Sequence, residues 1–175
     1  MLISSDDIKT IISAIAIGIS IASLFISRKS WLQSNRPIVT AFLSTTGGNT
    51  AAIFNLVISN TGNRPATNIR LYAKTEDIES LFDKNASEDK KSSTRLCFSE
   101  KSLIPILRNG EDIETAFGAY APTPQNQPWL NYDVQINITV KYSDLDGRRY
   151  TSAMPLRLFS RTGFAGSEWS IHSKT

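Results

Sequence analysis

Cysteine and histidine are almost absent from this 175-residue sequence, which contains one of each. A single cysteine cannot close an internal disulfide, and it cannot build the multi-cysteine sites that usually hold structural zinc. The one histidine, His172, lies near the C-terminal end of the sequence, where a frayed chain is a poor platform for a catalytic base. We therefore expect neither zinc chemistry nor catalysis by histidine.

Catalytic and ligand motifs are missing too: there is no glycine-rich phosphate loop, nucleophile elbow or metal-ligand spacing. The stretch from Asp144 to Gly147 resembles part of a calcium loop, but an EF-hand alignment leaves two obligatory ligand positions unfilled, which favours a hairpin turn. Asp112 and Glu114 share one face of a predicted strand while Glu111 points away, as at an exposed strand edge. We predict a protein that is not an enzyme and binds no metal or cofactor.

Neither sign of charge dominates, because 19 Lys and Arg residues against 16 Asp and Glu residues give a formal net charge of +3. So small an excess argues against nucleic acid as a partner. Arg148 and Arg149, together with Arg28 and Lys29, are candidate contacts for an anionic membrane surface. The alternative is that these cations cover a solvated face.

The sequence does contain one long uncharged run, from Thr10 to Ser27. As an α-helix this run is roughly 27 Å long, close to the hydrocarbon thickness of a bilayer. A cleaved secretory signal would begin with a basic segment, whereas this leader carries Asp6, Asp7 and only Lys9. We predict one retained transmembrane helix over residues 10–27.

The flanks of this run predict its orientation, because basic residues are retained on the cytoplasmic side. Lys9 precedes the run, whereas Arg28, Lys29 and Arg36 follow it. We expect the N-terminus outside and the rest of the chain in the cytosol, where an unpaired thiol such as Cys97 is tolerated.

Small residues recur inside the predicted helix. Ala14, Gly18 and Ala22 are spaced every four residues, which lets two helix backbones approach closely, and Ser13 and Ser20 add hydroxyls that could bond across a helix pair. We expect homo-oligomerisation through this face; the alternative is that these residues reflect composition alone.

Beyond residue 36 the pattern changes to a period of two. Residues 132–142 alternate apolar and polar, residues 149–158 do the same, and the Asp-Gly signal of Ser143–Arg148 lies between them, so we predict a hairpin. Further strand patterns cover Ile38–Leu43, Ala52–Ile58, Ile69–Ala73, Leu96–Phe98, Leu103–Leu107 and Ile113–Phe117. Seven or eight short strands with regular turns predict an all-β antiparallel sandwich.

The segments between these strands are assigned by composition. Residues 60–65 and Asn109-Gly110 are turn sequences. Thr75–Asp83 has the pattern of a helix, with Thr75 as its cap. The charged stretch Asn85–Ser93 is predicted to be a loop, and Cys97 to be a buried strand residue with an unreactive thiol.

Three stretches carry the resemblance to a known family: Asn55–Ile69, Leu107–Glu111 and Val140–Asp144. Their strand and turn pattern resembles that of CARDB-like immunoglobulin-fold domains. A transmembrane helix followed by Trp31, Arg36-Pro37 and one such domain is similar to a loose class of uncharacterised bacterial single-pass membrane proteins. The resemblance covers roughly residues 31–158. It implies an immunoglobulin-like sandwich that acts as a binding or adhesion-type module, and it transfers no functional residue. We place the protein in the bacterial inner membrane.

These patterns divide the chain into an N-terminal flank (1–9), a transmembrane helix (10–27), a basic connector (28–36), an immunoglobulin-like sandwich (37–159) and a tail (160–175). We predict a membrane-anchored adaptor whose cytosolic domain binds a partner protein. Loops on a rigid sandwich commonly carry recognition, which makes Trp129, Pro124 and Pro128 candidate contacts. The alternative function is a membrane effector, of a stress or phage-defence type, whose helices cluster and perturb the bilayer.

Overall fold

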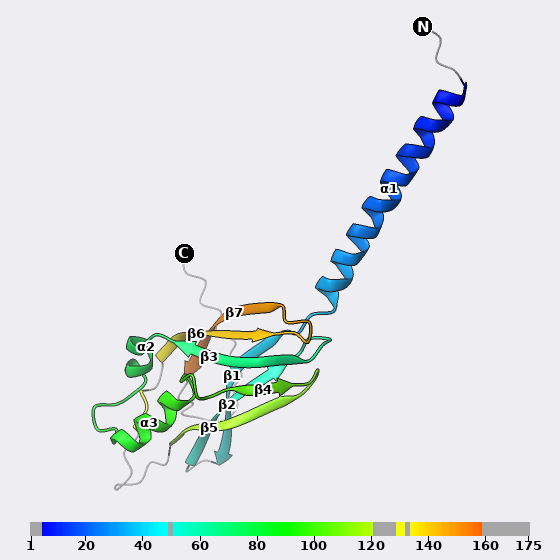
Figure 1. Ribbon diagram of the computed structural model, residues 1–175. Helices are drawn as coiled ribbons and strands as arrows, with labels where there is room; N and C mark the ends of the chain where they lie inside the picture. The colour runs from blue at the N-terminus through cyan, green and yellow to red at the C-terminus, as the bar shows by residue number, and fades with distance from the viewer. Residues whose placement is uncertain (1–4, 49–50, 121–128, 132–133, 159–175) are drawn as a thin grey trace, which may run out of the picture.

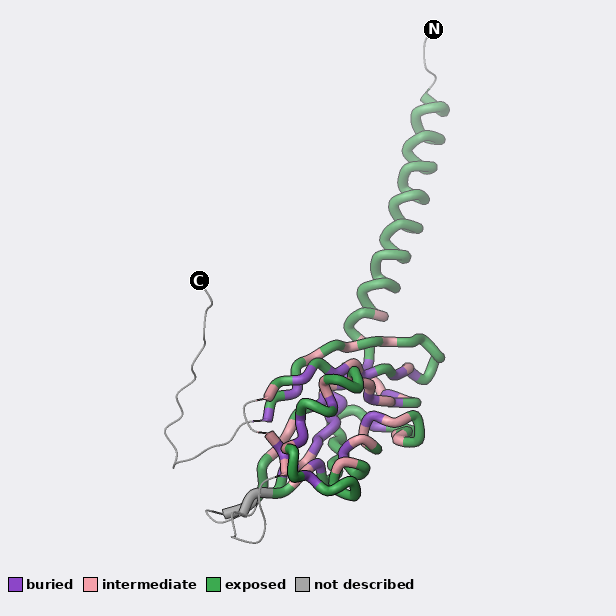
Figure 2. Tube along the Cα trace, turned by 90° about the vertical axis from the view of Figure 1, so that its left-hand side faces the viewer, coloured by how far each residue is buried: buried purple, intermediate pink, exposed green. Residues whose placement is uncertain are grey.

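The computed structural model describes residues 5–48, 51–120, 129–131 and 134–158 (Figure 1). A long N-terminal helix projects from a body made of two antiparallel sheets, which confirms the predicted helix and the sandwich-like architecture. Figure 2 shows that buried residues gather inside the body, whereas the helix is exposed along nearly its whole length.

Helix α1 extends over Ser5–Ser34 and is the one described helix long and apolar enough to cross a membrane. It has no buried residue, so its apolar side chains are not part of the protein core. The helix is longer than expected, because residues 5–9 of the predicted flank form its first turn and residues 28–34 of the predicted connector form its last turns. It ends shortly before Pro37, which disfavours helical geometry at the preceding residue.

Seven described strands form the body. The three-stranded sheet has the order β1-β2-β5 and consists of β1 (Val39–Gly48), β2 (Ala51–Asn60) and β5 (Asp112–Tyr120). The four-stranded sheet has the order β4-β3-β6-β7 and consists of β4 (Ile104–Leu107), β3 (Ala66–Ala73), β6 (Val134–Ser143) and β7 (Arg149–Leu158). All strand pairs are antiparallel.

The β6–β7 hairpin was predicted correctly. Val134 pairs with Leu158 and Ser143 pairs with Arg149, and Gly147 in the turn has a φ of +79° that favours glycine. Along β6 the buried residues occupy every second position, from Ile136 to Tyr142. These side chains pack with those of the other sheet in one core, to which β2 contributes Phe54, Leu56 and Ile58.

Two predicted turns have a different role from that of hairpin turns. Residues 60–65 connect β2 to β3, and residues 108–111 connect β4 to β5. In both cases the two strands belong to different sheets. These turns therefore carry the chain across the sandwich, and β4 and β5 are left as edge strands on the same side of it.

Two expectations about residues 85–98 are wrong. Helix α3 (Glu88–Leu96) occupies the predicted loop, and Cys97 lies just after this helix rather than in a strand. The helix is stabilised by acidic residues in its first turn and by Arg95, which bridges Glu79 and Glu88. Its Thr94 is buried and donates to the carbonyl of Phe117 on β5 (3.1 Å).

Helix α2 (Thr75–Ser80) confirms the second predicted helix, although its N-cap is Lys74 and no side chain caps it. Thr75 is therefore the first helical residue and not the cap. The isolated bridge between Phe82 and Leu130 joins the segment after α2 to the core.

Candidate functional site

The end of α1 is bonded to the turn between β2 and β3. The side chain of Asn63 donates to the carbonyl of Ser34 (3.2 Å), its main-chain N–H donates to Arg36 (3.2 Å), and Thr61 N–H donates to Ile38 (2.9 Å). We call the contact between residues 34–38 and 60–64 the junction. It ties the orientation of the helix to that of the sandwich.

Asn60 is the buried centre of the junction, with no exposed surface. Its Oδ1 accepts from the N–H groups of Ile38 (3.2 Å) and Gly62 (3.1 Å), and its Nδ2 donates to the carbonyls of Arg64 (2.8 Å) and Leu107 (3.1 Å). One side chain thus joins the chain after α1, the β2–β3 turn and β4.

The junction extends to the β6–β7 turn through Arg64. This guanidinium lies 5.8 Å from the ring centroid of Trp31 on α1 and 2.7 Å from the carboxylate of Asp146. The hydrogen bond from Arg64 lowers the pKa of Asp146 below its ordinary value. Trp31 on α1 is therefore linked through Arg64 to a turn of the four-stranded sheet.

Asp144 holds that turn through hydrogen bonds within the turn and to β7. Its buried carboxylate accepts from the N–H groups of Asp146 and Arg148 (both 2.9 Å) and from the hydroxyl of Tyr150 (3.1 Å). Burial, and then the bond to Asp144, raise the pKa of Tyr150. Nowhere in the described ranges do three or more His, Cys, Asp or Glu residues form a group able to hold a metal ion.

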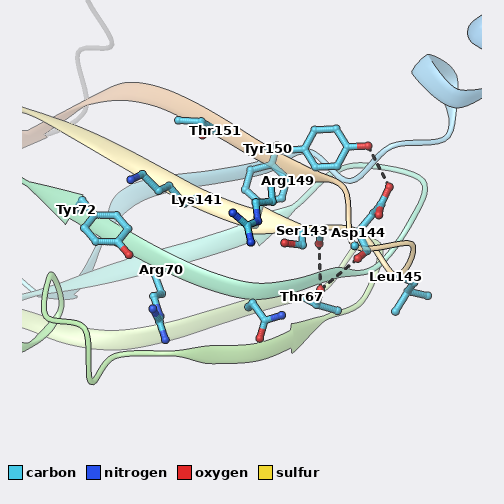
Figure 3. A pocket seen from close by; sticks show the side chains of 13 residues that line it. Thr67, Arg70, Tyr72, Lys141, Ser143, Asp144, Leu145, Arg149, Tyr150 and Thr151 are labelled. Atoms are coloured by element: carbon cyan, nitrogen blue, oxygen red, sulfur yellow. Dashed lines mark hydrogen bonds between the residues drawn. The ribbon is translucent and has the colours of Figure 1, made fainter.

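A broad groove of about 880 Å³ lies on the outward face of the four-stranded sheet (Figure 3). Three cations from three neighbouring strands line it: Arg70 on β3, Lys141 on β6 and Arg149 on β7. We call it the basic groove. Tyr72, whose ring centroid is 4.7 Å from the Lys141 ammonium, also lines it.

A second cavity, of about 590 Å³, opens between β4 and β5, the edge strands of the two sheets. Its floor reaches the buried core residues Leu56, Ile58 and Leu71, and Leu103 and Ile113 stand at its rim with exposures of 39% and 43%. We call it the β4–β5 cleft. It is the more apolar of the two cavities, and the apolar side chains at its rim are exposed.

The cleft is bridged at both ends. At one end, the side chain of Asn60, the last residue of β2, donates to the carbonyl of Leu107 on β4 (3.1 Å). At the other end, the bond from Thr94 joins α3 to β5. Between these bonds the described strands β4 and β5 do not pair with each other.

Cys97 lines the β4–β5 cleft. It is half-buried, its thiol donates weakly to the carbonyl of Ser93 (3.8 Å), and burial raises the pKa of that thiol. The location in a strand was wrong, but the raised pKa agrees with an unreactive thiol. The cleft also contains polar atoms of Ser93, Ser102 and Glu114.

Of the three predicted partner contacts, Trp129, Pro124 and Pro128, the structure describes only Trp129. Trp129 is half-buried and stacks on Phe82 (centroids 6.3 Å apart), so it packs on the end of the sandwich instead of standing free as an anchor. Pro124 and Pro128 lie outside the described residues, as does the predicted tail from residue 160.

The predicted basic contacts separate into two kinds. Arg28 and Lys29 are exposed on α1, and Arg149 lines the basic groove. Arg148 is instead paired with Asp144 (3.7 Å) and Asp146 (3.6 Å). Arg149 and Arg157 are both exposed on β7, at the even spacing that places them on one sheet face.

The small-residue face of α1 remains exposed. Ala14, Gly18 and Ala22 are exposed, and a Cβ added at Gly18 would meet no atom within 4 Å. The hydroxyls of Ser13 and Ser20 donate to carbonyls of their own helix, at 2.9 and 2.8 Å. The face is therefore free to meet a second helix, but these hydroxyls already have partners.

Arg70, Lys141 and the cleft residues were missed by sequence reasoning. Lys141 and Arg149 do stand at outward positions of the predicted hairpin, so their shared face could have been read from the alternation. Arg70 and the cleft depend on which strands are neighbours, which the alternation does not reveal.

Comparison with known proteins places the chain in a family. Residues 3–160 match the family described as Domain of unknown function (DUF8453), and the chain belongs to it. The match begins at the N-terminal side of α1 and extends past β7, so the family unit comprises the helix together with both sheets. No curated protein matches the chain.

Proposed function

We propose that this member of the DUF8453 family is a membrane-anchored, non-enzymatic interaction protein. Its α1 spans the bacterial inner membrane, and its sandwich binds an extended segment of a partner protein at the β4–β5 cleft. One observation carries the proposal: an apolar cavity open to solvent lies between two strand edges that no other described strand occupies.

Strand connectivity supports an immunoglobulin-like domain. The first, second and fifth strands form one sheet, and the third, sixth and seventh are neighbours in the other. Immunoglobulin folds group their A, B and E strands and their C, F and G strands in the same way. Here the fourth strand joins the second sheet, beside β3.

The membrane assignment rests on α1. Its apolar side chains are exposed to solvent in the isolated chain, which costs free energy that a bilayer would remove. Arg28 and Lys29 follow the apolar run and favour retention of that end, and hence of the sandwich, on the cytoplasmic side.

The cleft offers two features that a partner segment can use. Edge strands present unpaired main-chain groups that pair with an added strand, and side chains alternating along that strand can enter a pocket. Leu103 and Ile113 at the rim lie beside the edges of β4 and β5. The cleft volume, about 590 Å³, is ample for two or three apolar side chains.

Site-specific photocrosslinking in intact cells tests this proposal. A photoreactive residue at Leu103 should capture one defined protein, and Ile113→Arg should abolish that product by placing a charge in the apolar cleft. Ile53→Arg is the matched control, because Ile53 is 47% exposed on the other face of the three-stranded sheet. Equal loss with both variants, or no loss with Ile113→Arg, contradicts the proposal.

Cysteine labelling tests the orientation. The only cysteine can be moved to an exposed position by combining Cys97→Ala with Ser87→Cys. A membrane-impermeant maleimide should leave this variant unlabelled in intact cells and label it after permeabilisation. Labelling in intact cells would place the sandwich outside.

A membrane effector is the second candidate, favoured by the free small-residue face of α1. Close helix packing at Gly18 would allow α1 to cluster in the bilayer. If clustering is the function, overexpression should collapse the membrane potential, and Gly18→Leu should abolish this effect. Benign overexpression, with a partner crosslinked at the cleft, supports the adaptor.

A further inference from the structure

We propose that the basic groove is a binding site for a phosphate group, held by Arg70, Lys141 and Arg149. This site is separate from the β4–β5 cleft and does not depend on the adaptor function. The proposal rests on the register of the strands, the pairing of the charges and the position of the groove beside α1.

Strand register brings like charges together. Arg70 on β3 is the direct cross-strand partner of Lys141 on β6. Lys141 in turn pairs with Thr151 on β7, which places Arg149 diagonally across from it. Directly opposed like charges destabilise a sheet, so this arrangement costs stability unless an anion lies between the cations.

These cations are also free of carboxylate partners. Arg64, Arg95 and Arg148 each form ion pairs, whereas none of the three groove cations pairs with an acidic residue in the described part of the chain. The Nε of Arg70 is buried and bonds to no described atom. Among the described lining residues Asp144 is the one acidic residue, and its carboxylate is engaged in the β6–β7 turn.

The chemistry of the lining favours phosphate. Guanidinium groups match phosphate oxygens with two parallel hydrogen bonds, and an ammonium group adds a compact charge. Ser143 is the cross-strand partner of Arg149, and Thr151 that of Lys141, so hydroxyl donors stand beside the cations on the outward face (Figure 3).

The groove lies close to the membrane-proximal end of the sandwich. Leu145 and Gly147 of the β6–β7 turn line it, and the same turn reaches Trp31 on α1 through Asp146 and Arg64. Figure 3 shows α1 beyond this end of the groove. A phosphate group could therefore come from a lipid headgroup or from a soluble phosphate ester.

Binding can be measured on the full chain in nanodiscs of phosphatidylcholine, which has no net charge. Inorganic pyrophosphate should raise the thermal unfolding midpoint in a saturable manner, whereas chloride at the same ionic strength should not. Lys141→Gln and Arg149→Gln should each weaken pyrophosphate binding by roughly ten- to hundred-fold, as expected for the loss of one charge-assisted contact.

Arg157→Gln is the matched control. Arg157 is an exposed cation on the same strand as Arg149 but outside the groove, where it donates to the side-chain oxygen of Gln135 (2.6 Å). Its removal takes away the same charge and should leave pyrophosphate affinity within about twofold, because distant exposed charges are screened. Equal weakening by Arg157→Gln and Arg149→Gln would overturn the proposal.

A second arm distinguishes the two sources of phosphate. In nanodiscs that contain phosphatidic acid, a headgroup in the groove should raise the unfolding midpoint of the wild type but not of Lys141→Gln, and should reduce the effect of added pyrophosphate. Stabilisation by pyrophosphate alone indicates a soluble ligand. The proposal fails if neither phosphate source acts, or if a polyglutamate peptide binds more tightly than pyrophosphate.

Discussion

The junction and the β4–β5 cleft are built in opposite ways on the same sandwich. At the junction, Asn60 has no exposed surface and its side chain makes four hydrogen bonds to main-chain groups. At the cleft, edge strands face each other across an apolar cavity, and the bridging bonds lie at its two ends. The junction is thus made of hydrogen-bonded polar groups with defined geometry, whereas the β4–β5 cleft presents apolar surface.

This difference indicates that the two regions have different roles: the junction holds α1 and the sandwich together, and the cleft offers a binding surface. Buried hydrogen bonds are directional and costly to break, so the junction fixes how the sandwich stands relative to α1. The hydrophobic effect is not directional, and covering apolar surface with another apolar group is favourable whatever the exact geometry. The junction is suited to fix the sandwich relative to α1, and the cleft offers apolar surface that another group can cover.

The largest expected effect is at the centre of the junction. Asn60→Ala removes four hydrogen bonds, two of which are buried bonds to main-chain groups of Gly62 and Leu107. We expect the free energy of unfolding to fall by about 3 kcal/mol or more. Chemical denaturation of the full chain in detergent micelles measures this loss.

The control for this variant is Asn63→Ala. Asn63 is exposed, and its side chain makes one hydrogen bond, to the carbonyl of Ser34. Its removal should cost less than about 1 kcal/mol. Similar losses for both variants would show that burial does not distinguish the centre of the junction from its surface.

A second test adds volume where the junction is tightest. A Cβ at Gly62 would overlap main-chain atoms of Arg36, Pro37 and Ile38, which cannot move without displacing the segment that joins α1 to β1. Gly62→Ala should therefore destabilise the protein by about 2 kcal/mol. In Gly118→Ala the Cβ would overlap only the end of the Leu130 side chain, and differential scanning calorimetry should show a smaller loss.

The third test concerns the cleft and the reactivity of Cys97. Because burial raises the pKa of this thiol, less of it is thiolate at neutral pH, and alkylation by iodoacetamide should be several-fold slower than for Ser87→Cys in a Cys97→Ala background. The rate should continue to rise at pH values where that of the exposed thiol has levelled off. Equal pH profiles would contradict the protected environment of the cleft.

The smallest expected effect is the loss of stability at low pH that comes from the ion pair between Arg64 and Asp146, at the surface of the junction. Arg64 lowers the folded-state pKa of Asp146, so the ion pair stabilises the fold above the unfolded pKa of about 4. That contribution is lost as the pH falls through the lowered folded pKa. Asp146→Asn should flatten this part of the curve of stability against pH, and an unchanged curve would show that the pair contributes nothing.

Helix α1 and the β6–β7 hairpin could be predicted because their signals are local. An uncharged run and a strict alternation around Asp-Gly depend on neighbouring residues alone. Helix α3 was missed because its sequence, from Glu88 to Leu96, is strongly polar and lacks an apolar stripe. Its position depends on Arg95 bridging Glu79 and on Thr94 reaching β5, which are tertiary contacts.

The candidate sites show the same division. The alternation on β6 and β7 gives Lys141 and Arg149 a common face, but only the pairing of β3 with β6 brings Arg70 opposite Lys141. The cleft exists because the turn at residues 108–111 carries the chain from one sheet to the other, leaving β4 and β5 as facing edges. Neither the position of Arg70 opposite Lys141 nor the facing of β4 and β5 can be read from the hydrophobic periodicity of a single segment.

By itself, the sequence determined an exposed apolar helix, the antiparallel hairpin and the class of the fold, because hydrophobic periodicity and turn residues act over a few neighbouring positions. The tertiary structure decided which strands became neighbours, where Asn60 found its four partners, and which cations and apolar side chains came together. Such contacts join residues far apart in the chain, and their geometry is set by the packing of the two sheets.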